Sequence, residues 1–415
     1  MSNLSPQARI VETIYLCKFA DMFRHVNYLF IPVLLSVFPL AMDAEEIPVE
    51  GFAATDSATV SVPEKKGNIV SRVIEYFHQS NKRKLTRRPN FAPLGGPFYT
   101  SEKGFGIGLI IAGDYSTCPS DTLLPTSNVS LTGSLATKKY YSIGIEGTHV
   151  FPKDTRRLNY SLDFVSFNTY FWGIGYNWGN DNANKTEYSL FDITFAADYE
   201  WRLVNNIFLG PAIEVSYTNA HSISDYTPWQ GEDLRYWTIS AGALLQSDTR
   251  DNLTAPNSGH LFELTQLFSP SFFGNGNRAF TSTEIGYNLY RTVWNGGVLA
   301  SRIHGKWTFG HTPWGKLPSL DGNAIRAYYK GRYRDKCETD LYFELRQHVY
   351  RRSGIAVWAG VGTVYHKLTD ICFKRLLPEA GIGYRWEFKK NSNVRLDFGF
   401  GKHSSGFLFS INEAF

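Results

Sequence analysis

Hydrophobic and polar residues alternate along most of this chain, from about residue 97 to residue 415. In "NVRLDFGFG", Arg395 and Asp397 alternate with Leu396 and Phe398, and "EAGIGYRWEF" (379–388) repeats the pattern. A period of two places successive side chains on opposite faces of a β-strand. One face of these predicted strands is therefore aliphatic and aromatic, and the other carries charges and glycine.

The lengths of the links between the predicted strands also alternate. Short links such as 351–354 and 389–393 take turns with long polar ones such as 221–232, 269–278 and 310–340. A soluble sandwich alternates too, but its polar face meets water and its turns are evenly short. Short turns on one rim and long loops on the other are typical of outer-membrane barrels, whose apolar residues face lipid and whose charges face the lumen.

The number of strands follows from parity. Fifteen runs are clear, starting near residues 104, 127, 140, 157, 186, 206, 233, 259, 279, 297, 341, 355, 376, 394 and 405. A single-chain barrel with both ends on one side needs an even number. We assign the sixteenth strand to "YFWGIGYNWG" (170–179). The predicted fold class is all-β, a sixteen-stranded antiparallel transmembrane β-barrel over 96–415, with a short N-terminal periplasmic helix.

The N-terminal part differs in pattern. Residues 1–44 read as an upstream extension plus a signal peptide that starts at Met22, because a basic lead precedes an apolar core too short to span a bilayer. Residues 45–95 form a predicted periplasmic leader, with a short amphipathic helix at about 68–80. The following "NKRKLTRR" holds five basic residues in eight and either touches anionic lipid or is a solvated linker.

Composition narrows the class further. Aromatic residues make up 15% of the 415 residues, which favours strands. No apolar run is long enough for a membrane helix, and a net charge of +4 is too small to indicate a nucleic-acid partner. After loss of Cys17 with the signal, either Cys337 pairs with Cys372 or these two and Cys118 are all unpaired. No spacing of metal ligands is present, so we expect no metal, no cofactor and no catalytic residue.

Basic residues are concentrated in "IRAYYKGRYRDK" (325–336), between the predicted eleventh and twelfth strands. Arg326, Lys330, Arg332 and Arg334 lie among aromatic side chains. Taken alone, these cations could bind phosphate, nucleic acid or a carboxylate, or face water. The position of the segment in the fold must decide.

This segment resembles the arginine-bearing tip of the inward-folded loop in BamA/TamA-type outer-membrane proteins, the bacterial surface antigen family. "SDTRDNLTAPNSGHLFELT" (247–265) is similar to the periplasmic turn motif of that family, and 96–115 and 404–415 look like its first and last strands. The turn motif comprises Asp248, Arg250, Asp251, Pro256 and Gly259. The aromatic end of the chain resembles the signal by which such proteins reach their assembly machinery, through Phe407, Phe409, Ile411 and Phe415, which we expect to share one face.

The resemblance implies that the loop motif docks inside the barrel against acids of the next strands. The motif comprises Ile325, Arg326, Ala327, Tyr328, Arg332, Arg334 and Asp335, with Ala327 where the family has glycine. Glu344 fits the first acidic partner of Arg326. Gly360 stands where the second acid would be, so we expect Arg326 to keep one acidic contact.

The remaining expected partners lie on the lumen face of later strands. Arg346 shares that face with Glu344, and Arg332 and Arg334 would meet Asp397 or Glu387. The alternative is a basic surface loop without a fixed partner.

The resemblance also implies a function in outer-membrane protein or lipid assembly, or in translocation. Expected partners are outer-membrane lipids, the assembly machinery during biogenesis, and unfolded outer-membrane or exported proteins. The expected location is the outer membrane of a Gram-negative bacterium, with both termini periplasmic. Residues 45–95 are too short for the POTRA modules of assembling family members.

Two alternatives remain, a porin-like transport channel and an outer-membrane phospholipase. For the second, no convincing Ser-His-Asn arrangement is present, and "HSSG" (403–406) lacks partners at a usable spacing.

Overall fold

A computed structural model describes residues 86–100, 103–121, 124–253, 255–320, 325–389, 392–411 and 413–415. All of these residues belong to one unit, Gly67–Phe415. The signal peptide, the start at Met22, the helix at 68–80 and most of the basic linker lie outside the described residues. Those assignments stay predictions.

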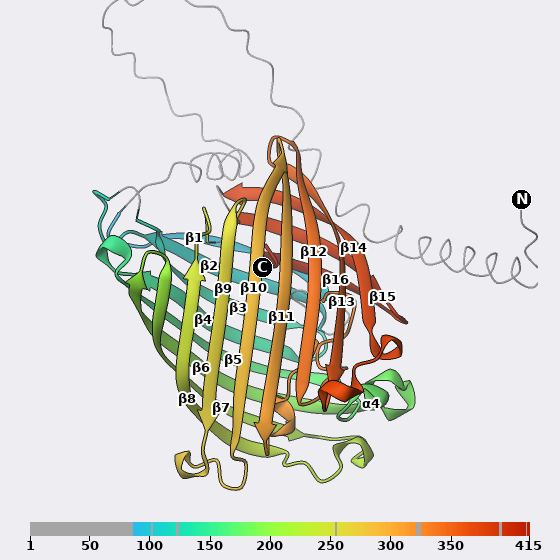
Figure 1. The fold of residues 1–415 in the computed structure, drawn as a ribbon. Helices are drawn as coiled ribbons and strands as arrows, with labels where there is room; N and C mark the ends of the chain where they lie inside the picture. Colours follow the sequence, from blue (N-terminus) through green and yellow to red (C-terminus); the bar gives the residue numbers. More distant parts are fainter. Residues whose placement is uncertain are drawn as a thin grey trace, which may run out of the picture. The chain divides into compact units, whose positions relative to one another are not determined.

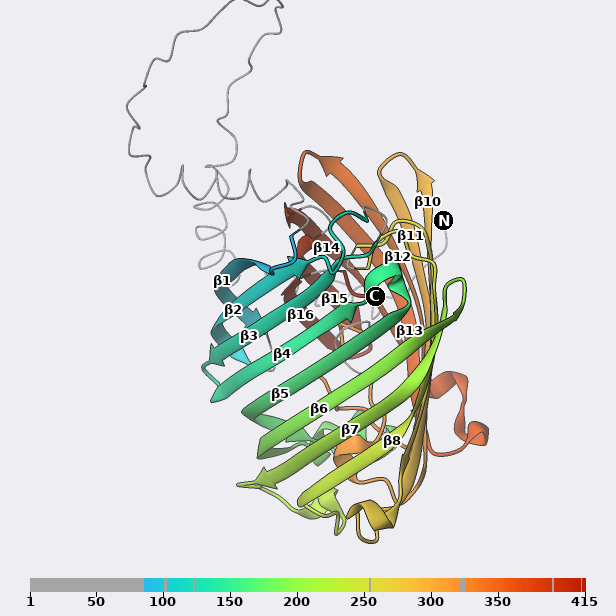
Figure 2. The ribbon, with the colours of Figure 1, turned by 90° about the vertical axis from the view of Figure 1, so that its left-hand side faces the viewer.

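The described residues form one antiparallel sheet of sixteen strands in chain order (Figure 1). Each strand pairs with its sequence neighbours, and the first and last strands lie next to each other, so the sheet curves round into a barrel (Figure 2). The strands are β1 Asn90–Thr100, β2 Gly104–Tyr115, β3 Ser127–Ala136, β4 Tyr140–Val150, β5 Arg156–Phe171, β6 Thr186–Val204, β7 Ile207–His221, β8 Arg235–Asp248, β9 Gly259–Ser269, β10 Phe280–Trp294, β11 Gly297–Gly310, β12 Cys337–Tyr350, β13 Ser353–Tyr365, β14 Leu377–Lys389, β15 Ser392–Gly401 and β16 Ser404–Ile411.

Helices are short and confined to the links. They are α4 Tyr176–Asn180 and the 3-10 turns η2 Pro152–Asp154, η3 Asn182–Asn184, η4 Thr227–Trp229, η5 Ser271–Phe273, η6 Trp314–Lys316, η7 Leu368–Asp370 and η8 Phe373–Arg375. Within the described residues, none of these helices has the length and apolar character needed to cross a bilayer.

The count of sixteen strands is confirmed, but the placement of one strand was wrong. The strand missing from the sequence count is β1, which pairs with β2 along its whole length, so the sheet begins six residues before residue 96. Segment 170–179 is not a strand: β5 ends at Phe171, and Gly173 and Gly175 then adopt positive φ and turn the chain into α4. The sequence count missed β1 because its prolines interrupt the alternation of residue types. Proline is nevertheless tolerated in a strand at the edge of a sheet.

The two faces of the strands are those that the alternation predicted. On β11, Ile303 and Phe309 are more than half exposed on the outer face, whereas Ala300 is fully buried. On β14, Ile382 points outward and Glu379 is buried. The apolar residues therefore form the outside of the barrel and the charged ones its interior.

The two rims also differ as predicted. The long links 172–185, 222–234, 270–279, 311–336 and 366–376 all lie on one rim, because each follows an odd-numbered strand. On the other rim, the links after β6, β10, β12 and β14 have two residues each, although the links 116–126 and 249–258 on this rim are longer. With an even number of strands, β1 begins and β16 ends on this short-link rim.

The described residues of the link between β11 and β12, 311–320 and 325–336, fold into the interior. Their apolar side chains are buried in two clusters of aromatic residues from the strands and the other long loops. One cluster contains Leu320, Ile325, Ala327, Tyr328 and Tyr333 of the link, and the other contains Trp314. We call residues 311–336 the lumen loop.

Candidate functional site

Arg326 is the centre of a charged site inside the barrel. Its Nη2 lies 2.5 Å from Oε2 of Glu344 on β12, and its Nη1 lies 2.8 Å from Oδ2 of Asp397 on β15. None of the three side chains has exposed surface. A guanidinium held between two carboxylates fixes the loop tip by charge-assisted contacts in a defined geometry.

Aromatic rings enclose the same guanidinium. It lies 4.1 Å from the ring centre of Trp358 and 5.4 Å from that of Tyr342. Both rings therefore add cation–π attraction to the ion pairs. Gly360, opposite Tyr342 on the next strand, is required here, because a Cβ at that position would overlap the tyrosine ring.

The prediction that Arg326 faces Glu344 agrees with this geometry, but the prediction of a single acidic contact was wrong. The second acid is Asp397, three strands beyond Glu344. Space at the position of Gly360 is taken by the ring of Tyr342, and the curvature of the barrel brings β15 close to β12. The contact between Arg326 and Asp397 could not be predicted from sequence spacing, because it depends on how the sheet curves.

Arg332 and Arg334 do not meet Asp397 or Glu387, contrary to the prediction. Arg332 Nε donates to the carbonyl of Gly179 in the link after β5 (2.8 Å), and Arg334 Nη1 donates to the carbonyl of Trp314 (2.8 Å). Burial lowers the pKa of Arg334. Arg332 therefore fastens the lumen loop to the link after β5, and Arg334 joins two parts of the lumen loop itself, so neither arginine binds a strand acid.

Asp335 of the motif also binds locally. Its Oδ1 accepts from the amide of Lys336 (2.8 Å) and lies 3.4 Å from Nδ1 of His366. The loop motif thus divides into a tip that binds strand carboxylates and a base that binds neighbouring loops.

The two carboxylates that hold Arg326 also hold further arginines of the barrel wall. Glu344 lies 2.7 Å from Arg346 and 3.4 Å from Arg385, and Asp397 lies 2.5 Å from Arg385. Arg346, predicted as a lumen residue, reaches the end of the chain as well, where its Nη2 donates to the carbonyl of Phe415 (3.1 Å). Because the pairs share partners, removal of one carboxylate disturbs several arginines at once.

The backbone of the loop tip is bound by residues that sequence reasoning missed. Ala327 N–H donates to Oε2 of Glu379 on β14 (2.7 Å), and Ser404 Oγ of β16 donates to the carbonyl of Ala327 (2.6 Å). Tyr328 OH donates to the carbonyl of Pro378 (2.7 Å). Ala327 is absent from the residues with positive φ, so alanine at this position costs no backbone strain.

Two glycines of the last strands form the surface under this tip. A Cβ on Gly399 would lie 3.0 Å from the amide nitrogen of Ala327, and a Cβ on Gly406 would overlap the carbonyl oxygen of Arg326. Both face each other in the β15–β16 pairing. Glycines at matching positions of neighbouring strands are the sequence signal that could have indicated a close backbone approach here.

The turn motif lies on the short-link rim, between β8 and β9. Asp248 accepts two hydrogen bonds from Arg250 (2.9 and 3.1 Å) and lies 3.1 Å from Nη1 of Arg157 on β5. Asp251 Oδ1 accepts from the backbone amides of Asn257 and Ser258. Pro256 is buried, and Gly259 has a φ of 96° with no space for a Cβ beside Thr249. The structure therefore brings the five predicted residues together in one ordered turn.

Comparison with solved structures gives the fold an independent reference. BamA of Haemophilus ducreyi lacking POTRA domains 1–3 superposes with a TM-score of 0.50 at 12% identity, over 78% of this chain and 70% of that one. CdiB of Escherichia coli superposes with a TM-score of 0.51 at 11% identity, over 84% and 71%. This chain has the BamA and CdiB fold. No family model matches the sequence, and neither does any curated protein.

We expected the hydrophobic residues at the end of the chain to share one face of the last strand. That prediction was wrong, because Phe407 and Phe415 lie on opposite sides of the barrel wall. Phe407 packs against Phe398 on the outside (ring centres 4.8 Å apart), but Phe415 packs against Tyr342 on the inside (5.4 Å). The strand ends at Ile411, so alternation no longer controls the direction of Phe415. Phe409 and Ile411 belong to β16 and pair with Leu396 and Val394, but their side chains are outside the described set.

The three cysteines of the described part, Cys118, Cys337 and Cys372, are free, so the alternative without a disulfide holds there.

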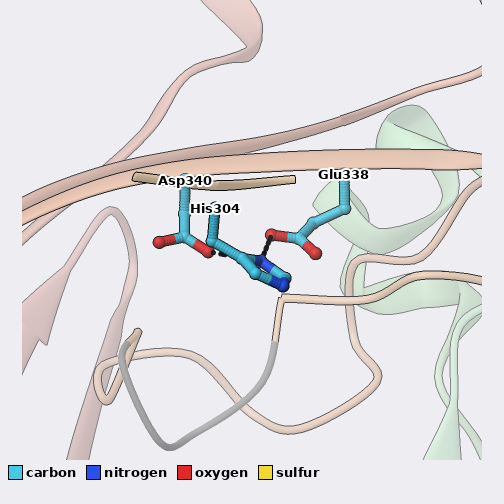
Figure 3. Close-up of side chains that lie close together, drawn as sticks. All are labelled: His304, Glu338 and Asp340. Atoms are coloured by element: carbon cyan, nitrogen blue, oxygen red, sulfur yellow. Dashed lines mark hydrogen bonds and ion pairs between the residues drawn. The ribbon is translucent and has the colours of Figure 1, made fainter. Parts of the chain in front are cut away.

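A different group of side chains on β11 and β12 has the composition of a metal site. The ligand atoms of His304, Glu338 and Asp340 lie within 4.8 Å of one another (Figure 3). Sequence spacing did not reveal this group because its members come from two strands separated by the lumen loop.

Proposed function

We propose that this protein is an integral outer-membrane barrel of the BamA/TamA type that takes part in protein insertion or secretion, with the lumen loop docked as an internal structural element. The observation that carries the proposal is Arg326 between the buried carboxylates of Glu344 and Asp397. A resemblance read from the sequence predicted an inward-folded arginine loop, and the fold shared with BamA and CdiB supports the same interpretation.

The location follows from the same proposal. The apolar outer face suits lipid, and the short-link rim, where β1 begins and β16 ends, would face the periplasm. Partners would be membrane lipids, the assembly machinery during biogenesis, and unfolded protein clients. Nucleic acid is not among them.

We also propose that the protein is not an enzyme. In "HSSG" the Ser404 hydroxyl is engaged with the Ala327 carbonyl of the loop tip (2.6 Å). The side chain that invited a catalytic interpretation is thus accounted for by loop docking.

Depletion of the protein in its host, followed by quantification of the other outer-membrane barrel proteins and of lipid asymmetry, tests the function. Complementation with wild type and with Glu200→Gln is expected to restore barrel-protein levels, whereas Glu344→Gln is not. Glu200 is a suitable control because it is as buried as Glu344 but binds Asn159 on β5, away from the lumen loop. Unchanged barrel proteins and unchanged lipid asymmetry after depletion would refute the proposal.

An open pocket lined by β3 to β6 favours a second candidate, a transport channel for cations. It has a volume of about 280 Å³, and its lining on β3 to β6 includes Glu146 and Asp198 with the amide side chains of Asn128 and Asn159. Acidic side chains that line a channel attract cations. A steady cation-selective conductance in planar bilayers that is unchanged in Arg326→Ala would support this candidate and remove the role of the docked loop.

A further inference from the structure

The group formed by His304, Glu338 and Asp340 lies where the lumen loop leaves the barrel wall. His304 on β11 pairs directly with Asp340 on β12. Glu338 lies two residues before Asp340 on the same face of β12. All three side chains point toward one another (Figure 3). At most 13% of any of these side chains is exposed.

One ring nitrogen faces both carboxylates. Nδ1 of His304 lies 3.2 Å from Oδ2 of Asp340 and 3.6 Å from Oε1 of Glu338. A single N–H can donate to only one acceptor at good geometry, and the hydrogen bond goes to Asp340. Oε1 of Glu338, whose side chain is 95% buried, lies 3.6 Å from the same nitrogen. Oδ1 of Asp340 is buried and has no hydrogen bond among the described residues. A buried carboxylate oxygen without a hydrogen bond is costly, which favours a cation at this point.

The distances from Nδ1 of His304 to the two carboxylate oxygens fit the spacing of ligand atoms around one metal ion. Zinc binds histidine nitrogen and carboxylate oxygen at about 2.0–2.2 Å, so two ligand atoms of one tetrahedral ion are roughly 3.4 Å apart. The two distances from Nδ1 lie on either side of that value. Three protein ligands, one nitrogen and two oxygens, would leave a fourth position for water.

The second ring nitrogen is already held as metal sites require. Nε2 lies 3.1 Å from Oε1 of Glu284 on β10, and Oε2 of Glu284 lies 2.8 Å from Nζ of Lys306. A carboxylate that accepts from the distal nitrogen favours the tautomer with its proton on Nε2, in which Nδ1 can bind a metal in place of its hydrogen bond with Asp340. The local charges agree: three carboxylates face two fixed cations, Lys306 and Arg302, the latter 3.4 Å from Asp340.

We propose that His304, Glu338 and Asp340 form a binding site for one divalent transition-metal ion of the zinc class. Imidazole with carboxylates suits zinc, whereas calcium and magnesium prefer oxygen ligands alone. A bound ion would join β11 to β12 just before the lumen loop begins and just after it ends. The site is separate from the Arg326 cluster, and it stands or falls independently of the proposed function.

The test uses the full-length protein, purified in detergent, freed of metal by chelator and equilibrated with Zn²⁺. Elemental analysis and titration calorimetry are expected to give one zinc per chain. Glu338→Gln and His304→Gln are expected to lose this binding, and Glu284→Gln to keep one site at an affinity roughly ten- to a hundredfold lower. His348→Gln, a histidine elsewhere on β12 that contacts the Arg351 carbonyl, is the matched control and should bind like wild type.

Heat-dependent mobility on gels shows whether each variant still folds. If His304→Gln fails to fold, the near-isosteric Glu338→Gln decides the outcome. No retained zinc in the wild type, equal zinc in Glu338→Gln and wild type, or displacement of zinc by excess Ca²⁺ would each overturn the proposal.

Discussion

Replacement of Glu344 by glutamine tests how the lumen loop is held. Glu344 is fully buried and lies 2.5 Å from Arg326, 2.7 Å from Arg346 and 3.4 Å from Arg385. The substitution keeps the shape of the side chain and removes its charge, so three arginines lose a shared partner. Asp397 still faces Arg326, and the tip is therefore weakened but retains one acid.

The free-energy cost of Glu344→Gln can be judged from the burial of the ion pair that it breaks. Removal of one partner of a buried ion pair costs about 3–5 kcal/mol because it leaves an uncompensated charge. With Asp397 still present we take the lower end, about 3 kcal/mol, which corresponds to a change of roughly a hundredfold in the ratio of docked to released loop. The released fraction of the loop should rise by that factor.

Limited proteolysis of the folded protein in detergent measures this fraction. Trypsin cleaves after lysine and arginine, and of its sites in 325–336, Arg326 and Arg332 are buried when the loop is docked, whereas Lys330 is exposed. When opening is fast, the rate of cleavage follows the population of the open form. The rate of cleavage after Arg326 and Arg332, read from the masses of the fragments, should therefore increase by up to two orders of magnitude in Glu344→Gln.

The control separates loop release from general loosening of the barrel. Glu200→Gln removes an equally buried carboxylate that binds Asn159, away from the loop. It should leave cleavage of the loop at the wild-type rate. Equal acceleration in both variants, or none in Glu344→Gln, would refute the docking argument.

Three further changes test other contacts of the same fold. Gly406→Val should release the lumen loop as well, because a side chain there overlaps the Arg326 carbonyl; tryptic cleavage at the wild-type rate would contradict this. Trp358→Leu removes the ring 4.1 Å from the guanidinium and should lower the unfolding free energy by about 1–2 kcal/mol in urea titrations in lipid vesicles, and an unchanged midpoint would count against the cation–π contact. In the folded protein a maleimide should label Cys372, which is exposed, and reach Cys337 only after unfolding; early labelling of Cys337 would show that its burial is wrong.

Alternation of residue type predicted most of the strands and their two faces, because these depend on local periodicity, and the alternating lengths of the links predicted the two rims of a barrel. Alternation did not predict β1, where Pro93 and Pro97 interrupt the pattern of an edge strand. It also mistook the aromatic segment 170–179 for a strand, since aromatic residues favour strands while Gly173 and Gly175 end one here.

The site was predicted in part for the same physical reason. Glu344 could be assigned to Arg326 because the resemblance placed an acidic partner on the next strand, but Asp397 depends on how the sheet curves over three further strands. Contacts of the loop backbone, such as Ala327 with Glu379, leave no trace in residue type. The direction of Phe415 was missed because periodicity ends with the strand at Ile411.

The glycine surface under the loop tip has a consequence for how this protein can change over evolution. Gly399, Gly406 and the backbone at Arg326 occupy one shared volume although up to eighty residues separate them in the chain. A side chain gained at either glycine requires a different path of the loop, and a longer or bulkier tip requires different last strands. These segments therefore form one unit of selection, and exchange of a loop between related barrels will succeed only when β15 and β16 are exchanged with it.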